Sequence, residues 1–317
     1  MSIPGDPQQW RVGLVGYGEV GRILAEDLRK QGVTVAAYDI KLATSSDAPL
    51  RQHAARHDVS LAGSHAELVS HADFILSAVT ASQTVAVTGT CAPSIKRDAF
   101  FLDFNSASPG AKIKAAGLVE AGGARYVEGA VMTAIAPYRI RVPLLLGGPS
   151  ATAFQPLAVA LGFNATVAAE KLGVASATKM CRSVTVKGLE AMVIESFTAA
   201  RAYGVENQVV ASLAETFPGI DWEKQGAYFF QRVIQHGRRR AEEMREAAAT
   251  VREAGLEPWS AAGTAERQAW MADLADARVF EGSDPVRGGW RGEADRVLDA
   301  VKSGSSVRLQ PDVKARG

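Results

Sequence analysis

The feature that most constrains this chain is a glycine-rich turn between an apolar run and an amphipathic stretch. The segment "VGLVGYGEVGRILAEDLRK" begins at Val12 and places Gly16, Gly18 and Gly21 within six residues. The residues before the glycines are typical of a buried strand, and those after them repeat at helical spacing as far as Gly32. A strand that enters a helix through such a turn is typical of a doubly wound α/β domain.

Each glycine has its own physical reason. Gly16 allows a sharp turn, Gly18 lets a pyrophosphate approach the backbone, and Gly21 lets helix and strand pack closely, while the free N–H groups of the helix start favour phosphate. Asp39 closes the next apolar run, 18 residues beyond Gly21, where a carboxylate accepts hydrogen bonds from ribose hydroxyls and repels a 2′-phosphate. We therefore expect NAD, with NADP less favoured although Lys41 would attract a phosphate. The predicted cofactor-binding residues here are Gly16, Tyr17, Gly18, Glu19, Val20, Gly21 and Asp39.

Strand-like and helix-like segments continue to alternate through the first half of the chain. Further strands are expected within residues 33–39, 73–79, 99–105, 124–131 and 142–148, with helices after Ser64 and Ser108. From about residue 168 the pattern becomes helical, beginning with one long buried helix that ends at Gly204. The predicted fold is a Rossmann-type, doubly wound, mostly parallel sheet in a dinucleotide-binding domain at residues 1–167. An all-helical domain at residues 168–317 is expected to contain the central helix and to serve substrate binding and dimerisation.

Charge and composition exclude several classes of protein. Lys and Arg number 35 and Asp and Glu 34, a balance that favours neither nucleic acid nor a membrane surface as a partner. No apolar run reaches the roughly 20 residues of a membrane helix, and the polar start "MSIPGDPQQW" is unlike a signal peptide. The two cysteines form no disulfide framework. We expect a cytoplasmic protein that acts on a small molecule.

A second polar segment, "DFNSASPG" from Asp103 to Gly110, follows a predicted strand. Doubly wound sheets bind ligands at the carboxyl ends of their strands, so Asn105, Ser106 and Ser108 are candidates for contact with a ligand. The alternative is that Ser106 or Ser108 caps the next helix, because Pro109 is a favourable first helical residue.

A third group lies on the long helix. Lys179, Ser183, Lys187 and Glu190 recur at a spacing that places them on one side, with Arg182 nearby. Buried lysines are costly unless they are paired or used. The alternative is a solvated stripe in which Lys187 pairs with Glu190.

Together these motifs resemble the β-hydroxyacid dehydrogenase family, which includes 3-hydroxyisobutyrate and 6-phosphogluconate dehydrogenases. The resemblance covers about residues 10–200: "GYGEVG", "DFNSASP" in place of the family's D-x-S-T-x-x-P, and "GVASATKMCRS" in place of its G-x-G-x-x-x-K-x-x-N-N. The rest of the chain resembles a branch with a phosphogluconate-dehydrogenase-like C-terminal domain. The glycine-led lysine is the most specific of the three motifs.

The resemblance assigns roles to individual residues. Lys179 matches the catalytic lysine, Ser106 the residue near the nicotinamide, and Thr80 a contact to the cofactor ribose. The residues expected to bind substrate are Asn105, Ser106, Met132, Ser183 and Lys187. Two departures concern the substrate: "MTA" from Met132 replaces the family's "SGG", and Arg182 and Ser183 replace its asparagine pair.

The predicted function is that of an NAD-dependent oxidoreductase that interconverts a small polar hydroxy acid and its carbonyl product, with a sugar-derived acid as one candidate. Lys179 would serve as general acid and base, and Lys179, Arg182 and Lys187 would supply surplus positive charge for a carboxylate. The alternatives are a dinucleotide-binding regulator without turnover and a reductase of a related carbonyl or imine substrate. The resemblance also implies a homodimer.

Three further patterns have simpler interpretations. His53 and His57 in "HAARH" are one helical turn apart but lack an evident third ligand, so we expect an exposed helix and no metal site. "RRR" at residues 238–240 is typical of a solvated helix face. His236, just before it, is a candidate to reach the active site of a partner subunit.

Overall fold

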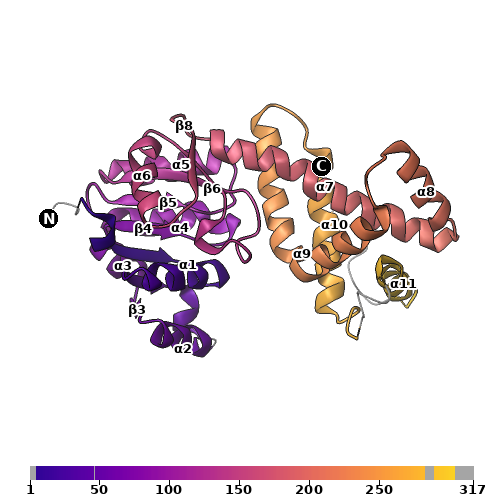
Figure 1. Ribbon diagram of the computed structural model, residues 1–317, viewed down its shortest axis with the longest axis horizontal. Helices are drawn as coiled ribbons and strands as arrows, with labels where there is room; N and C mark the ends of the chain where they lie inside the picture. The colour runs from indigo at the N-terminus through magenta and orange to yellow at the C-terminus, as the bar shows by residue number, and fades with distance from the viewer. Residues whose placement is uncertain (1–4, 46, 283–288, 304–317) are drawn as a thin grey trace, which may run out of the picture. The chain divides into compact units, whose positions relative to one another are not determined.

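The computed structural model of the chain describes residues 5–45, 47–282 and 289–303 (Figure 1). Its contacts divide the chain into two compact units, Met1–Met180 and Cys181–Gly317. Helix α7 (Val174–Tyr203) crosses this division without a break. A division of roles at residue 167/168 stays a prediction, and by their contacts residues 168–180 belong to the first unit.

The first unit contains an eight-stranded sheet in the order β3-β2-β1-β4-β5-β6-β7-β8. Neighbouring strands are parallel, except that β6 and β7 are antiparallel. The predicted fold class, a Rossmann-type and mostly parallel sheet followed by helices, is confirmed. The strands are β1 (Arg11–Val15), β2 (Thr34–Tyr38), β3 (Ser60–Leu61), β4 (Phe74–Ser77), β5 (Phe100–Asp103), β6 (Arg125–Val131), β7 (Leu144–Gly147) and β8 (Ala165–Ala169).

Both faces of this sheet are buried. On β4, Phe74 and Leu76 belong to one hydrophobic core, while Ile75 between them belongs to the other. Because successive side chains point to opposite faces, burial on both sides explains why the strands are continuous apolar runs. The helices of this unit are α1 (Glu19–Lys30), α2 (Ala48–Arg56), α3 (His65–His71), α4 (Thr84–Cys91), α5 (Pro109–Ala121) and α6 (Ala151–Ala160). Short 3-10 helices are η1 (Pro7–Gln9), η2 (Ile40–Ala43), η3 (Ala81–Gln83), η4 (Ala92–Ser94) and η5 (Arg139–Arg141).

Two strands and one orientation were not predicted. β3 has only two residues, and β8 has the weak pattern ATVAA, in which two of five residues are exposed. Both are too short or too small to produce a strong periodic signal. β7 pairs with β6 in the antiparallel direction, with Glu128 opposite Gly147. The sequence pattern could not predict this direction, because side chains alternate in the same way in parallel and antiparallel strands.

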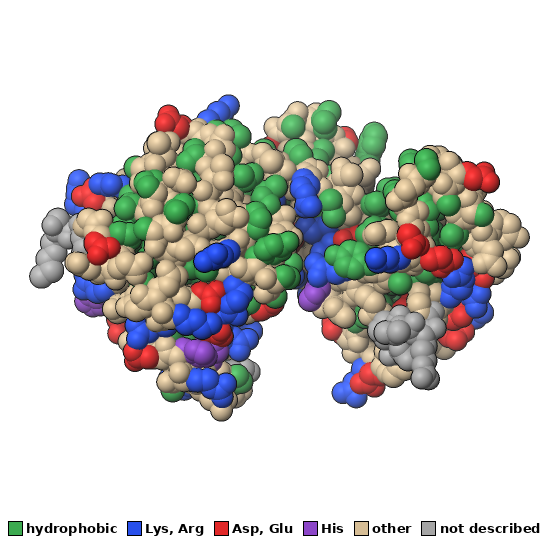
Figure 2. Space-filling view, in the orientation of Figure 1, with side chains coloured by type: hydrophobic (Ala, Val, Ile, Leu, Met, Phe, Trp, Pro, Cys, Tyr) green, Lys and Arg blue, Asp and Glu red, His purple; other side chains and the backbone are tan. Residues whose placement is uncertain are grey.

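The second unit is helical, as predicted. Beyond α7 it contains α8 (Glu206–Thr216), α9 (Trp222–Glu253), α10 (Trp259–Asp276) and α11 (Gly289–Lys302). Its core packs Phe197, Phe230 and Trp290 with residues of α10. None of the helices in the described part of the chain combines the length and the apolar character that crossing a membrane requires. On the face drawn in Figure 2, side chains of both charges are interspersed, in keeping with the balanced composition.

Candidate functional site

The glycine turn between β1 and α1 has the geometry that its sequence predicts. Gly16 adopts φ +92°, and a Cβ at Gly21 would lie 2.2 Å from the Gly16 carbonyl oxygen, so both positions require glycine. A Cβ at Gly18 would meet nothing within 4 Å. Gly18 is also the N-cap of α1 and makes no side-chain cap, so no capping side chain occupies the first N–H groups of the helix. This cradle fits the pyrophosphate of a dinucleotide.

Asp39 lies at the end of β2 and is held against this turn. Its Oδ2 accepts a hydrogen bond from the Tyr17 backbone N–H at 2.9 Å, and its Oδ1 accepts one from the Lys41 N–H at 2.9 Å. The carboxylate is half-buried and keeps lone pairs for further donors. Its position suits the predicted contact with a ribose, which stays a prediction.

The other residues predicted to bind cofactor differ in exposure. Tyr17 is fully buried, and burial raises the pKa of its phenol to about 12. Its hydroxyl lies 2.8 Å from Nδ1 of His53, a contact that the sequence did not indicate. Glu19 is exposed, Val20 packs on the core, and Thr80 is exposed at the start of η3. Their roles toward a cofactor stay predictions.

Asn105 and Ser108 hold the serine loop that follows β5. The buried Asn105 amide accepts a hydrogen bond from the Val79 N–H at 2.7 Å and donates one to Ser77 Oγ at 3.1 Å, which ties the loop to the end of β4. Ser108 is the N-cap of α5, so the capping alternative applies to Ser108 and not to Ser106. Asn105 is therefore a positioning residue in this structure, and its predicted contact with substrate stays a prediction.

A buried ion pair supports the loop from below. Lys112 of α5 is fully buried, lies 2.9 Å from Oδ1 of Asp103, and donates to the carbonyl oxygens of Asp103 and Gly129. Tyr126 donates its hydroxyl to Asp103 Oδ2 at 2.7 Å; burial and this neighbouring carboxylate hold the pKa of Tyr126 well above its ordinary value. The sequence analysis did not single out these residues. A lone lysine at a core-facing position of an alanine-rich helix was the available signal.

The structure brings Lys179 and Ser106 together. The Lys179 Nζ donates a hydrogen bond to Ser106 Oγ at 2.5 Å, and both side chains are half-buried. Lys179 lies in the second turn of α7, and Ser106 lies just beyond the carboxyl end of β5. Two residues that are 73 positions apart thus form one pair at the sheet edge where doubly wound folds bind ligands.

A buried carboxylate fixes the start of the helix that carries Lys179. Glu128 of β6 is fully buried and accepts hydrogen bonds from the N–H of Gly173 at 2.7 Å and of Ser176 at 2.5 Å. A negative charge at a helix N-terminus satisfies orphan N–H groups and interacts favourably with the helix dipole. Glu128 thereby sets the position of α7 one turn before Lys179. The analysis missed it, although a single acid inside "YVEGAV" is an unusual strand residue.

Further along α7, Lys187 of the predicted cluster of cations has a carboxylate partner. Ser183 and Lys187 are buried, and the Lys187 Nζ lies 2.8 Å from Glu243 Oε2 and 3.2 Å from Ser183 Oγ. Arg182 is exposed. The expected surplus of positive charge at Lys187 is therefore wrong, because α9 supplies Glu243. The predicted alternative, pairing of Lys187 with Glu190, is wrong as well.

Glu190 pairs instead with Arg240, the third arginine of "RRR". Arg240 donates to both carboxylate oxygens of Glu190, with Gln268 of α10 beside them, and all three side chains are buried. The prediction of a solvated face holds for Arg238 and Arg239, which are exposed, and is wrong for Arg240. Periodicity did not reveal that α9 packs this arginine against α7.

Two predicted residues remain, one in each unit. Met132 is half-buried just after β6, where its N–H donates to the Pro143 carbonyl. His236 is half-buried on α9. Their roles toward substrate and toward a partner subunit stay predictions.

Comparison with known proteins adds to this geometry. Residues 11–156 match the NAD binding domain of 6-phosphogluconate dehydrogenase, and residues 200–271 match a domain of unknown function. A conserved hypothetical protein from Sinorhizobium meliloti is 34% identical, with a TM-score of 0.73, over 92% of this chain and 96% of that one. A second conserved protein, described as structurally similar to 3-hydroxyacid dehydrogenases, is 27% identical, with a TM-score of 0.65, over 84% and 98% of the two chains. The chain belongs to the β-hydroxyacid dehydrogenase family.

Two solved structures of lower identity share the fold. The Mycobacterium tuberculosis 3-hydroxyisobutyrate dehydrogenase, solved with L-serine, is 16% identical, with a TM-score of 0.58, over 87% of this chain and 96% of that one. A reductive aminase from Aspergillus terreus, solved with NADPH, is 19% identical, with a TM-score of 0.52, over 92% and 99% of the two chains. These two likenesses concern the fold, and the match at residues 11–156 shows the NAD(P)-binding domain.

Proposed function

We propose that this chain is an NAD-dependent oxidoreductase that interconverts a small polar hydroxy acid and its carbonyl product. The observation that carries the proposal is the 2.5 Å hydrogen bond between Lys179 Nζ and Ser106 Oγ at the carboxyl end of β5. A side-chain amine beside a hydroxyl at this edge is a suitable acid–base pair for an alcohol, and family membership supplies the reaction type.

A dinucleotide held by the glycine turn and Asp39 would supply the hydride acceptor for the carbon that carries the hydroxyl. Lys179, in its neutral form, takes the hydroxyl proton, and in the reverse direction its ammonium returns that proton to the carbonyl oxygen. Ser106 orients the lysine through their hydrogen bond. Asp103, Lys112 and Glu128 touch none of the reacting atoms in this scheme and act by holding the loop and the helix.

The test is the variant Lys179→Ala. Turnover is expected to fall by about two to four orders of magnitude, the scale for loss of a positioned acid or base. Cofactor binding is expected to stay within a few-fold, because the phosphate cradle lies at Gly16–Gly21. The assay follows NADH formation with a panel of polar 3-hydroxy acids and their uncharged amides. Near-normal turnover of the variant would contradict the assignment.

The same assay separates the proposal from a regulator that binds the dinucleotide without turnover. If the unaltered protein binds NAD but converts no hydroxy acid in either direction, and reduces neither carbonyl nor imine, the regulator becomes the better account. The acid and amide pairs also test whether the substrate is an anion. Lys187 is paired with Glu243, so we do not expect Lys187 to bind the substrate carboxylate. A preference for the acid over the amide would therefore come from groups near Lys179.

The cofactor preference is proposed from Asp39. Its carboxylate lies at the end of β2 beside the glycine turn. There it would accept hydrogen bonds from the ribose hydroxyls of NAD and repel the 2′-phosphate of NADP. NAD is expected to bind more tightly than NADP in fluorescence titrations, and Asp39→Asn should narrow the difference while keeping an acceptor for the Tyr17 N–H. Equal or tighter binding of NADP by the unaltered protein would contradict the preference.

We also propose a homodimer formed through the helical domain, as the family resemblance implies. Large hydrophobic side chains are exposed on this part of the chain, among them Met192, Tyr203, Phe217, Tyr228 and Trp259. Exposed apolar side chains of this size favour burial against a partner. Light scattering coupled to gel filtration measures the mass in solution, and a monomer at micromolar concentration would contradict the proposal.

A further inference from the structure

Three side chains that can bind a metal lie together beside α1 and α2. Glu26 comes from α1, His53 from α2, and His57 directly follows α2. One ligand atom from each lies within 4.8 Å of the other two, and all three side chains are half-buried. Two histidines four residues apart are a common pair of zinc ligands, and the fold adds the third ligand that the sequence did not reveal.

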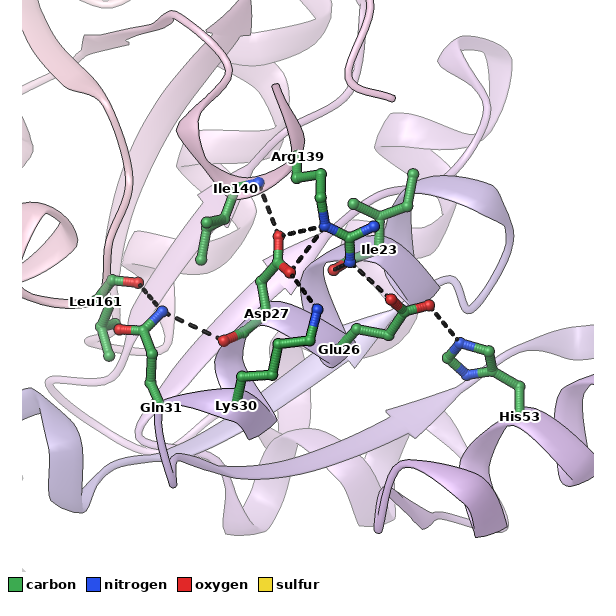
Figure 3. A network of polar contacts seen from close by, with 9 residues as sticks. All are labelled: Ile23, Glu26, Asp27, Lys30, Gln31, His53, Arg139, Ile140 and Leu161. Atoms are coloured by element: carbon green, nitrogen blue, oxygen red, sulfur yellow. Dashed lines mark hydrogen bonds and ion pairs between the residues drawn. The ribbon is translucent and has the colours of Figure 1, made fainter. Parts of the chain in front are cut away.

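The histidine ring is already oriented. The Nδ1 of His53 lies 2.8 Å from the buried Tyr17 hydroxyl. The Nε2 of His53 lies 3.0 Å from Oε1 of Glu26, a contact drawn in Figure 3. The ring nitrogen that faces Glu26 is therefore the one available to a metal, while the other can donate its hydrogen to Tyr17. Ligating histidines commonly have such an outer partner, which fixes the tautomer and the ring.

The carboxylate is oriented in the same way. Arg139 of η5 donates to Oε2 of Glu26 at 2.7 Å and, through its Nε, to both oxygens of Asp27 (Figure 3). This leaves Oε1 of Glu26 directed toward His53. Lys30 also pairs with Asp27, at 3.4 Å, so Arg139 and Lys30 both have carboxylate partners in Glu26 and Asp27.

The His57 ring completes the group. Its centroid lies 4.5 Å from that of His53, and the two rings are tilted by 32°. Ligand atoms around a tetrahedral zinc ion lie closer together than 4.8 Å, because each is about 2.0–2.2 Å from the metal. The rings would close on the ion by rotation about their side-chain torsions, with the backbone of α2 kept in place.

We infer that Glu26, His53 and His57 form a binding site for a divalent cation of the zinc type, with water as the fourth ligand. Two imidazoles and one carboxylate are a donor set that zinc accepts in four-coordinate sites. The ion would replace the hydrogen bond between His53 and Glu26. It would link α2 to α1 and, through Tyr17, to the glycine turn. The competing account is that protonated His53 and Glu26 form an ion pair and bind no metal.

The experiment uses the full chain without a histidine tag, with Cys181 replaced by serine because this thiol is exposed. After treatment with a chelator, the protein is titrated with Zn²⁺ by calorimetry and with Co²⁺ by visible absorption. We expect one ion per chain with a dissociation constant of about 1 μM or tighter. Co²⁺ should give the intense absorption of a four-coordinate ion.

Three variants decide between the accounts. His57→Gln and Glu26→Gln should each weaken Zn²⁺ binding by more than about 100-fold, beyond the range for loss of an outer partner. The matched control is His71→Gln, an exposed histidine on α3, which should bind as the unaltered protein does. Circular dichroism confirms that each variant is folded. Absence of a saturable equivalent, or unchanged affinity in His57→Gln or Glu26→Gln, overturns the site.

Discussion

The sheet unit and the helical unit each bury a salt bridge, but the two have different partners. Lys112 and Asp103 lie under the serine loop and also bond to backbone groups and to Tyr126. Arg240 and Glu190 join α9 to α7 through their side chains. The first pair holds the loop on which Ser106 is placed, whereas the second holds helices together. A buried charge near a proposed site therefore need not belong to the chemistry of that site.

The largest expected effect comes from breaking the helical pair. Arg240→Met leaves the Glu190 carboxylate buried without its partner, and the free energy of unfolding should fall by about 3–5 kcal/mol. In the double variant Arg240→Met, Glu190→Leu, most of this loss should be recovered, because two apolar side chains then replace two charges. Urea denaturation followed by circular dichroism measures both, with Arg239→Met, an exposed neighbour, as the control.

The corresponding double variant in the sheet unit sharpens the comparison. Lys112→Met, Asp103→Leu should remain destabilised, because it leaves the Tyr126 hydroxyl and the Asn105 N–H without their acceptor. Equal recovery in the two double variants would remove the distinction between the units.

A smaller effect is expected at Glu128, which caps α7. Glu128→Gln keeps one acceptor but loses the charge, so the free energy of unfolding should fall by about 1.5–3 kcal/mol, the range for hydrogen bonds to charged groups. If the protein turns over as proposed, kcat should fall by about 10- to 100-fold through displacement of Lys179, with cofactor affinity unchanged. Glu120→Gln on the exposed side of α5 is the control. A loss of stability without any loss of kcat would show that the cap has no part in placing Lys179.

The smallest expected effect is a pH dependence of stability that arises at the amino ends of the strands, opposite the end that carries Ser106. Asp73, which precedes β4, accepts hydrogen bonds from Arg11 and Lys96. Burial alone would raise the pKa of Asp73, but these bonds outweigh it and hold the pKa below its ordinary value. A carboxyl group with a lowered folded-state pKa stabilises the protein above its unfolded-state pKa, and this contribution is lost as the pH falls through the folded-state value.

The stability difference between the unaltered protein and Asp73→Asn should therefore be constant near neutral pH. It should shrink as the pH falls below about 4, the ordinary pKa of an aspartate. Thermal unfolding across this range measures it. Because Asp73 lies at the amino end of its strand, away from Ser106, turnover at neutral pH should not change. A difference that grows on acidification would contradict the stated sign.

Much of the fold could be predicted because it depends on local patterns. The turn after β1 requires glycine at Gly16 and Gly21 because of its backbone geometry, so these residues reveal it. Apolar runs such as those of β4 and β5 reveal strands that are buried on both faces. Short or small strands such as β8, and the reversed direction of β7, leave no local pattern. Their places are set by pairing with distant strands.

In the candidate site, too, residues in local motifs could be predicted and residues that serve distant elements could not. Lys179 and Ser106 were predicted from motifs, and the structure adds that their side chains meet. Glu128 and Glu243 were missed, because a carboxylate that serves another element is recognisable only when the two elements are packed. The same reason explains the error at Lys187, whose partner comes from α9 and not from the next turn of its own helix.

Helix α7 runs unbroken through the division between the units, with Lys179 just before it and Lys187 just after it. In an α-helix each residue adds about 100° of rotation and about 1.5 Å of rise. One residue inserted or deleted near Cys181 would therefore rotate every later side chain about the helix axis by about 100° relative to the earlier ones. A change of length in this stretch would therefore alter which side chains share a face with Lys179, whereas a substitution at the exposed Arg182 would leave the helical register intact.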